Sequence, residues 1–177
     1  MRIKRILVPT DLSQASMPAL KLAAEFGKAF QAELVLLFVV VPFYTSGDIL
    51  SAGAVVASIV EMQNRAAGAA LAREVSRLGK LGVRARSIVV EGTAGATIVE
   101  RARKGSADLI IIGTHGRSGF SHAFMGSVAE RVVRTAGCPV LTVRSGAKQT
   151  TRKVASKHRG PRGSVGGIRR PSTTTLV

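Results

Sequence analysis

The chain has 177 residues, of which 46% are apolar, contains no Trp and carries a formal net charge of +16. This length is enough for one domain with a core of Val, Ile, Leu and Ala. No apolar run reaches the roughly 18 to 20 residues that cross a bilayer, and the first residues lack the apolar stretch of a signal peptide, so we expect a cytoplasmic protein without membrane contact.

Strand-like and helix-like segments alternate along the first 144 residues. Strands are indicated by short β-branched and aliphatic runs, and helices by apolar residues at helical spacing. In chain order, the predicted elements are strand Ile3–Val8, helix Gln14–Phe30, strand Glu33–Val41, a helix from about Ala54 to Leu81, strand Val83–Val90, helix Ala94–Lys104, strand Ala107–Ile112, a helix from about Ser127 to Ala136 and strand Pro139–Arg144.

This alternation predicts an α/β fold, a doubly wound parallel sheet of five strands with helices on both faces. In such sheets, ligands bind beyond the carboxyl ends of the strands, where the strand order reverses. The first strand ends in Pro9-Thr10-Asp11, and the fourth runs into a glycine-rich loop at 113–127. If these two strands are neighbours at the reversal, both polar segments meet in one crevice. Asp11 and Ser13 are also candidate caps of the first helix.

The positive charge is unevenly distributed. Residues 145–177 contain eight Lys or Arg and no acidic residue, whereas residues 1–144 contain 18 basic and 10 acidic residues, a net charge of +8. The Gly-, Ser- and Thr-rich tail has almost nothing to bury, so we expect it to be disordered. We therefore predict a domain at 1–144 and a basic tail at 145–177. The tail is either an arm for a polyanion such as nucleic acid or a solubilising appendage.

The loop GTHGRSGFSHAFMGS, residues 113–127, has the composition of an anion cradle. Gly113, Gly116 and Gly119 permit close approach of backbone N–H groups to a ligand, and Gly126-Ser127 opens a helix whose positive end favours phosphate. The spacing matches neither a Walker A loop nor the dinucleotide fingerprint. The alternative is that these glycines only turn the chain and cap a helix.

Other candidate residues carry weaker signals. His115 and His122 have no Cys or carboxylate at metal spacing and no visible catalytic partners, so we predict neither a metal site nor a catalytic triad. The single Cys138 is expected to be a small buried apolar residue. Phe43 and Tyr44 either cover a bound base or anchor their loop.

Two stretches of the sequence carry a family resemblance. The spacing Gly113-x2-Gly116-x9-Gly126-Ser127, between an Ile-rich strand and Cys138-Pro-Val-Leu-Thr-Val143, resembles the nucleotide motif of the universal stress protein family. The opening Arg5-Ile-Leu-Val-Pro9-Thr10-Asp11 is similar to that family's first strand and turn. The resemblance covers about 1–144. It implies the strand order 3-2-1-4-5 and ATP, with or without Mg²⁺, as the ligand of one subgroup.

The resemblance also implies roles for individual residues. Asp11 would accept hydrogen bonds from the ribose, Pro9 and Thr10 would shape the floor of the site, and Val39 would contact adenine. The phosphates would lie against the loop and the start of its helix. The residues implied there are Gly113, Thr114, Gly116, Arg117, Gly119, Gly126 and Ser127.

The sequence predicts a nucleotide site but no catalytic residues. We therefore expect an ATP-binding stress-response protein in which the nucleotide acts as a regulator. A weak ATPase or self-phosphorylating enzyme and a polyanion-binding protein are the alternatives. The strand Pro139–Val143 lies at a sheet edge in the implied order and is apolar, so we expect a homodimer through it.

Overall fold

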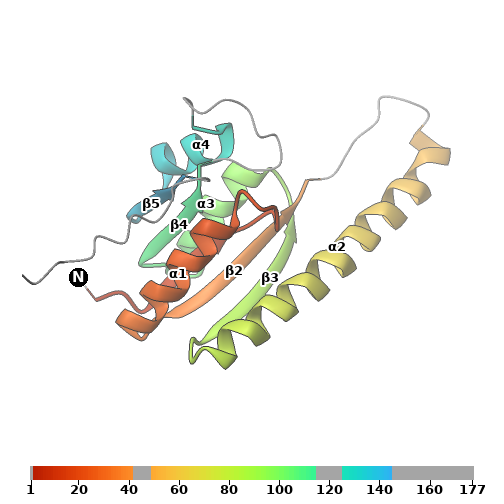
Figure 1. The fold of residues 1–177 in the computed structure, drawn as a ribbon. Helices are drawn as coiled ribbons and strands as arrows, with labels where there is room; N and C mark the ends of the chain where they lie inside the picture. Colours follow the sequence, from red (N-terminus) through yellow and green to blue (C-terminus); the bar gives the residue numbers. More distant parts are fainter. Residues whose placement is uncertain (1, 42–48, 115–124, 145–177) are drawn as a thin grey trace, which may run out of the picture. The chain divides into compact units, whose positions relative to one another are not determined.

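The computed structural model describes residues 2–41, 49–114 and 125–144, with the backbone alone for residues 49–55. Strands and helices alternate throughout these residues (Figure 1). The elements are β1 (Arg5–Pro9), α1 (Met17–Phe30), β2 (Glu33–Val40), α2 (Ile49–Lys80), β3 (Ala85–Glu91), α3 (Ala94–Lys104), β4 (Leu109–Gly113), α4 (Ser127–Thr135) and β5 (Val140–Val143).

The five strands form one parallel sheet in the order β3-β2-β1-β4-β5, which confirms the predicted fold. β1 is central, with Ile6 opposite Leu34 of β2 and Leu109 of β4. The chain moves outward from β1 to β3, returns to β4 and moves outward again to β5. The strand order therefore reverses between β1 and β4, as a doubly wound sheet requires.

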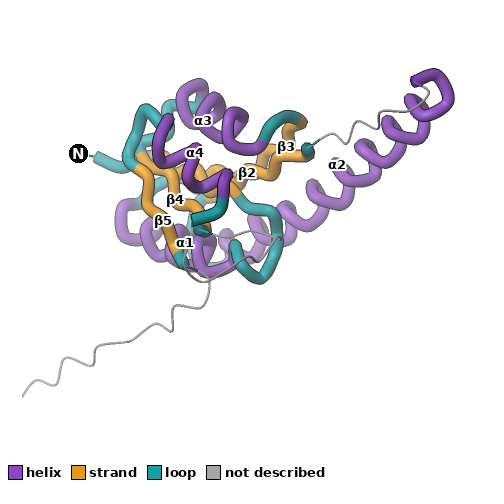
Figure 2. The backbone as a smooth tube through the Cα atoms, turned by 90° about the horizontal axis from the view of Figure 1, so that it is seen from above, coloured by secondary structure: helices purple, strands orange, loops and turns teal. Residues whose placement is uncertain are grey.

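Each face of the sheet is covered by two helices (Figure 2). On one face, Leu20 of α1 and Leu71 of α2 pack against the β2 side chain of Leu36. On the other face, Ile98 of α3, Val132 of α4 and Ile110 of β4 belong to one buried core cluster. Successive strand residues point to opposite faces, so the fully aliphatic runs of β1, β2 and β4 are explained by burial on both sides.

The start of α1 differs from the prediction. The helix begins at Met17, and its N-cap is Ser16, which makes no side-chain capping hydrogen bond. The expectation that Asp11 or Ser13 caps this helix is therefore wrong. The reason lies in the preceding turn, where Leu12 has a left-handed φ of 61° and interrupts the helical conformation.

α2 is longer than its predicted span because it begins at Ile49, about five residues earlier. The Asn64 side-chain amide donates to Glu91 Oε1 at 2.9 Å, and Glu91 is the last residue of β3. The residues before Asn64 therefore continue beyond the end of β3, as Figure 1 shows. At 1.5 Å per residue, the segment 49–63 is about 22 Å long. No helix of the described residues is both long and apolar enough to cross a membrane.

Candidate functional site

A pocket of about 350 Å³ lies beyond the carboxyl ends of β1 and β4, where the strand order reverses. Its volume falls in the range typical of small-molecule sites. Eight of the predicted site residues line it: Pro9, Thr10, Asp11, Val39, Gly113, Thr114, Gly126 and Ser127. Gly116, Arg117 and Gly119 lie outside the described residues, as do His115, His122, Phe43 and Tyr44.

The turn after β1 contributes the polar wall of the pocket. Thr10 N–H donates to Leu37 O at 2.9 Å, which extends the pairing of β1 with β2 by one residue. The Thr10 hydroxyl oxygen accepts from Leu12 N–H at 3.0 Å and lies 3.0 Å from Ser16 Oγ. Thr10 is 8% exposed and Ser16 is 5% exposed. Because these hydroxyl groups bond to each other and to the turn, the wall is already ordered before any ligand binds.

The Asp11 carboxylate is held in place by hydrogen bonds from Ser13. One oxygen of its carboxylate, Oδ1, accepts hydrogen bonds from Ser13 N–H at 3.0 Å and from Ser13 Oγ at 2.7 Å. This is the usual way in which an aspartate stabilises a turn. It places a carboxylate in the pocket wall instead of at the helix start. The polar wall therefore brings oxygen atoms of Thr10 and Asp11 to the lining of the pocket.

The opposite wall is formed where β4 ends and α4 begins. Gly126 N–H donates to Thr114 O at 2.8 Å, and Thr114 N–H donates to Val143 O at 2.9 Å. These bonds fix the two ends of the long glycine loop beside each other. The first backbone bond of α4 runs from Glu130 N–H to Gly126 O, so residues 127–129 have no acceptor within their own helix. Such N–H groups and the positive end of the helix dipole favour an anion.

The remaining lining residues are apolar, and some of them belong to α3. Ala94 and Ile98 reach the pocket from α3, beside Val39 of β2. α3 lies close to α4 because Gly95 has no side chain, and a Cβ there would be 2.7 Å from Arg131 Cδ. The pocket thus has an apolar side against β2 and α3 and a polar side against β1 and α4. This is the pattern expected for a ligand with an apolar ring and a charged group.

Sequence reasoning missed seven lining residues, namely Ser16, Leu37, Ala94, Ile98, Ile112, Val128 and Ala129. Ser16 follows the predicted turn by only a few residues, and its small polar side chain beside Thr10 was an available signal. No feature of the sequence marked Ala94 and Ile98 as lining residues, because their helical spacing explains both as core residues. Their position depends on how α3 crosses the sheet, which is a tertiary property.

Two titratable groups lie near the other end of the sheet and do not belong to the pocket. Asp108 accepts from the backbone N–H groups of Lys4 and Arg5, each at 2.8 Å, and these bonds lower its pKa. Burial raises the pKa of the Cys138 thiol, and the charge of Asp108 adds to this effect. The thiol is half-buried, so Cys138 is less enclosed than predicted. The described residues include no group of three His, Cys, Asp or Glu suited to a metal ion.

The fold and the pocket together define a doubly wound α/β protein with a pocket at the reversal of strand order. The model of the universal stress protein family matches residues 2–144, and the chain belongs to that family. This confirms the family that the sequence motifs resemble.

Individual relatives support this assignment. The chain is 37% identical over 153 residues to universal stress protein MJ0531 of Methanocaldococcus jannaschii, covering 82% of this chain and 85% of the relative. It is 30% identical over 154 residues to MJ0577 of the same organism, covering 80% and 94%. Among solved structures, universal stress protein UspA from Lactobacillus plantarum has a TM-score of 0.75 at 25% identity, covering 81% of this chain and 99% of that chain.

Proposed function

We propose that this universal stress protein binds ATP in the pocket between β1 and β4 and acts as a nucleotide-dependent regulatory protein. The observation that carries the proposal is the pairing of an acceptor-rich wall at Thr10 and Asp11 with a donor-rich wall at the start of α4. A nucleotide has the complementary groups, since its ribose hydroxyls donate and its phosphates accept. Mg²⁺ would accompany the phosphates and is not required for the protein contacts.

We infer one orientation for the proposed ligand. The phosphates would lie against the backbone N–H groups of 127–129, where the helix dipole favours negative charge. The ribose would then face Asp11, and the base would lie on the apolar side near Val39 and Ile98. The reverse orientation would place phosphate oxygens against the Asp11 carboxylate, and like charges repel there.

Structures of other proteins with this fold are consistent with an adenine nucleotide. One is a universal stress protein in complex with cAMP, at 23% identity, and another is the universal stress protein from Archaeoglobus fulgidus in complex with dAMP, at 20% identity. At these identities the likeness is one of fold alone.

The test is Gly126→Val. Gly126 has an extended backbone with φ of −63° and ψ of 147°, which valine also adopts, so the fold should persist. The added side chain would occupy the mouth of the pocket at the start of α4. We expect ATP affinity by calorimetry to fall at least about tenfold, or about 1.4 kcal/mol.

The matched control is Gly137→Val, where a Cβ would meet nothing within 4 Å and which does not line the pocket. It should bind ATP like the wild type. Equal ATP affinity in the wild type and in Gly126→Val would falsify the proposed site. Steady phosphate release that Asp11→Ala abolishes would instead favour the enzymatic alternative.

We also propose a homodimer through the edge strand β5. Within the described residues, β5 pairs with β4 on one side only, and its residues Val140 and Leu141 are partly exposed. On the adjoining helix α4, Val133 is 47% exposed. An apolar edge strand beside an exposed apolar side chain favours pairing with a second copy of the chain.

A further inference from the structure

Most of the positive charge of the described residues lies at the amino edge of the sheet, where the strands begin and the helices α1, α2 and α3 end. The described residues carry 17 Lys or Arg and nine Asp or Glu. The segments that meet at this edge, which we term the basic edge, are residues 4–5, 28–33, 74–86 and 100–108. They hold ten Lys or Arg and four Asp or Glu, a net charge of +6. The pocket lies at the opposite edge of the sheet.

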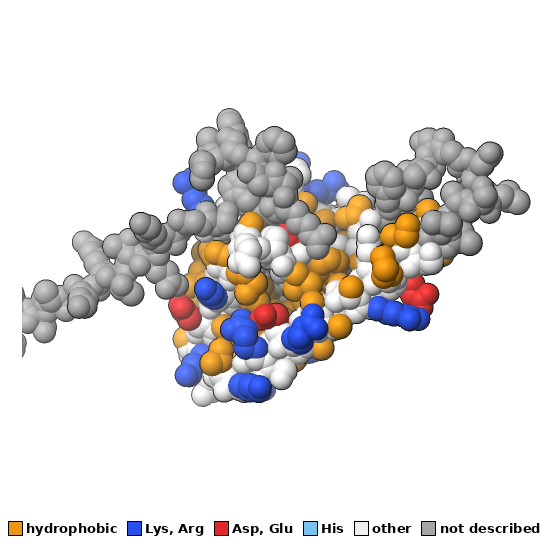
Figure 3. All heavy atoms as spheres, turned by 45° about the vertical axis from the view of Figure 1, so that its right-hand side comes forward, with side chains coloured by type: hydrophobic (Ala, Val, Ile, Leu, Met, Phe, Trp, Pro, Cys, Tyr) orange, Lys and Arg blue, Asp and Glu red, His pale blue; other side chains and the backbone are white. Residues whose placement is uncertain are grey.

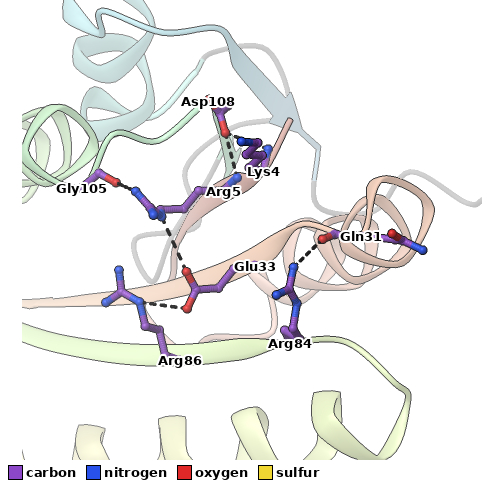
Figure 4. A network of polar contacts seen from close by, with 8 residues as sticks. All are labelled: Lys4, Arg5, Gln31, Glu33, Arg84, Arg86, Gly105 and Asp108. Carbon is purple, nitrogen blue, oxygen red and sulfur yellow. Dashed lines mark hydrogen bonds and ion pairs between the residues drawn. The ribbon is translucent and has the colours of Figure 1, made fainter. Parts of the chain in front are cut away.

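One part of the basic edge lies where α1 and α2 end. A Cβ at Gly27 would be 3.0 Å from Val83 Cγ1, so the last turn of α1 touches the turn that leads into β3. The guanidinium of Arg84 donates to Gln31 O at 2.8 Å (Figure 4). Lys28 and Lys80 occupy the last turns of the two helices, and both side chains are exposed. The cations Lys28, Lys80 and Arg84 are thereby brought together from the ends of α1 and α2 and from the residue before β3.

The other part crosses the starts of β1, β2 and β3. Glu33 lies between two arginines, 3.6 Å from Arg5 Nε and 3.2 Å from Arg86 Nε (Figure 4). Arg5 also donates to Gly105 O, which follows the last turn of α3. That turn contains Arg101, Arg103 and Lys104. One carboxylate shared by two guanidinium groups leaves a net positive charge on this part of the edge.

The acidic residues of the basic edge are already engaged. Glu74 pairs with Arg77 at 2.7 Å, and Glu100 pairs with Lys104 at 2.6 Å. Asp108 is bound by two backbone N–H groups. The excess cations have no acidic residue left at this edge to neutralise them. In the face shown in Figure 3, Lys and Arg side chains gather over the lower part of the molecule.

We propose that the basic edge of the folded domain binds the phosphate backbone of duplex nucleic acid. A cluster of Lys and Arg from several elements meets a regular array of phosphates and releases their counterions. Single-strand binding would require a row of aromatic platforms. Among the described exposed side chains, Phe30 is the aromatic at this edge, 48% exposed, and one ring does not form such a row. The contacts proposed are therefore to the backbone and independent of base sequence.

The competing explanation is that these cations only stabilise helix ends. Lys and Arg in a last turn complement the helix dipole, each by about 0.3 to 1 kcal/mol. That explanation covers Lys28, Lys80 and Arg103. It also covers Arg84, which donates to the carbonyl of Gln31 at the C-cap of α1, but it does not cover Arg86, which lies in β3. If these cations only stabilised helix ends, replacing them would lower the thermal midpoint of unfolding and leave nucleic-acid binding unaltered.

The test compares two variants of the full chain with equal net charge. The edge variant is Lys28→Gln/Arg84→Gln/Arg103→Gln, and the control variant is Lys21→Gln/Arg65→Gln/Arg73→Gln, from outside the basic edge. Binding to labelled DNA and RNA duplexes is followed by fluorescence anisotropy at about 50 mM and 200 mM salt. Both variants retain the basic tail, so its contribution is the same in each.

We expect the edge variant to bind duplex at least about tenfold more weakly at the lower salt, with a salt slope smaller by about 2 to 3. The control variant should retain most of the affinity, and ATP binding should be unchanged in both. Equal losses in the edge and control variants would overturn the proposal, because they would show an effect of total charge. Binding to phosphatidylserine vesicles, lost in the edge variant, without binding to duplex would also overturn it.

Discussion

The turn between β3 and α3 depends on the backbone conformation of Gly92, so replacing this residue should destabilise the domain. Gly92 has φ of +148°, and a Cβ there would lie 2.5 Å from Thr97 Oγ1. Thr97 is 9% exposed and lies in the first turn of α3, where its N–H donates to Thr93 O. We expect Gly92→Ala to lower the free energy of unfolding substantially.

Two effects contribute to the expected loss. A residue other than glycine in this region of φ costs about 1 to 3 kcal/mol in backbone strain. Overpacking against a buried side chain costs about 1 to 3 kcal/mol more. A loss of about 3 kcal/mol is therefore expected, which is a large part of the 5 to 15 kcal/mol that stabilises a typical domain.

A second substitution separates the two effects. Thr97→Ala removes the atom that the new Cβ would meet, but leaves the backbone strain at Gly92. In the Gly92→Ala background, Thr97→Ala should therefore cost about 1 kcal/mol less than it costs in the wild type. This difference isolates the steric part of the prediction.

The assay is urea unfolding followed by far-ultraviolet circular dichroism, since the chain has no Trp and one Tyr. The matched control is Gly68→Ala, inside α2, where a Cβ would meet nothing within 4 Å. The free energy of unfolding of Gly68→Ala should exceed that of the wild type by about 0.5 to 1 kcal/mol, because alanine favours the helix. If Gly92→Ala stayed within about 0.5 kcal/mol of the wild type, the strained turn described for Gly92 would be refuted.

Three further predictions concern the rest of the chain. Asp108→Asn should lower the free energy of unfolding by about 1 kcal/mol at neutral pH. This value is modest because the carboxylate is partly exposed. The pKa of Asp108 is lowered on folding, so its stabilisation is fully present above about pH 4 and is lost as the pH falls through the folded pKa. The deficit of the mutant in the free energy of unfolding should therefore be smaller at pH 3 than at pH 7. Leu141→Lys with Val143→Lys should give monomers in light scattering, and a monomeric wild type at tens of micromolar would end the β5 dimer proposal. Truncation after Arg144 should leave the thermal midpoint and ATP affinity unchanged while weakening salt-dependent nucleic-acid binding, whereas loss of folding would show that the domain boundary is misplaced.

The architecture could be predicted from the sequence because each strand is a short aliphatic run bounded by turn residues. Burial on both faces requires such runs in β1, β2 and β4, and the alternation with helices then limits the topology to a parallel sheet. The pairing of β1 with β4 was implied by the family resemblance, and the polar residues that end both strands would then meet in one crevice. The pocket between Thr10 and Gly126 agrees with that reasoning.

Other features required three-dimensional information. The start of α1 was misplaced because a left-handed Leu12 is uncommon and no local pattern marks it. Ala94 and Ile98 reach the pocket only because Gly95 allows α3 to approach Arg131 of α4. The basic edge was hidden for a similar reason, since its cations come from segments far apart in the sequence. The predicted roles of Gly116, Arg117 and Gly119 stay predictions.

The extension of α2 past β3 gives one unbroken helix two different environments. From Ala67 to Leu78, its buried side chains join the core, so amide hydrogens there should exchange with solvent only through large-scale opening. At residues 56–63 the helix extends beyond the strands of the described residues, and Ile59 and Met62 are 44% and 64% exposed. A helical segment of this length is marginal in water without such contacts. Deuterium uptake should therefore change sharply near Asn64, within a single helix, and mark where the cooperative unit of the domain ends.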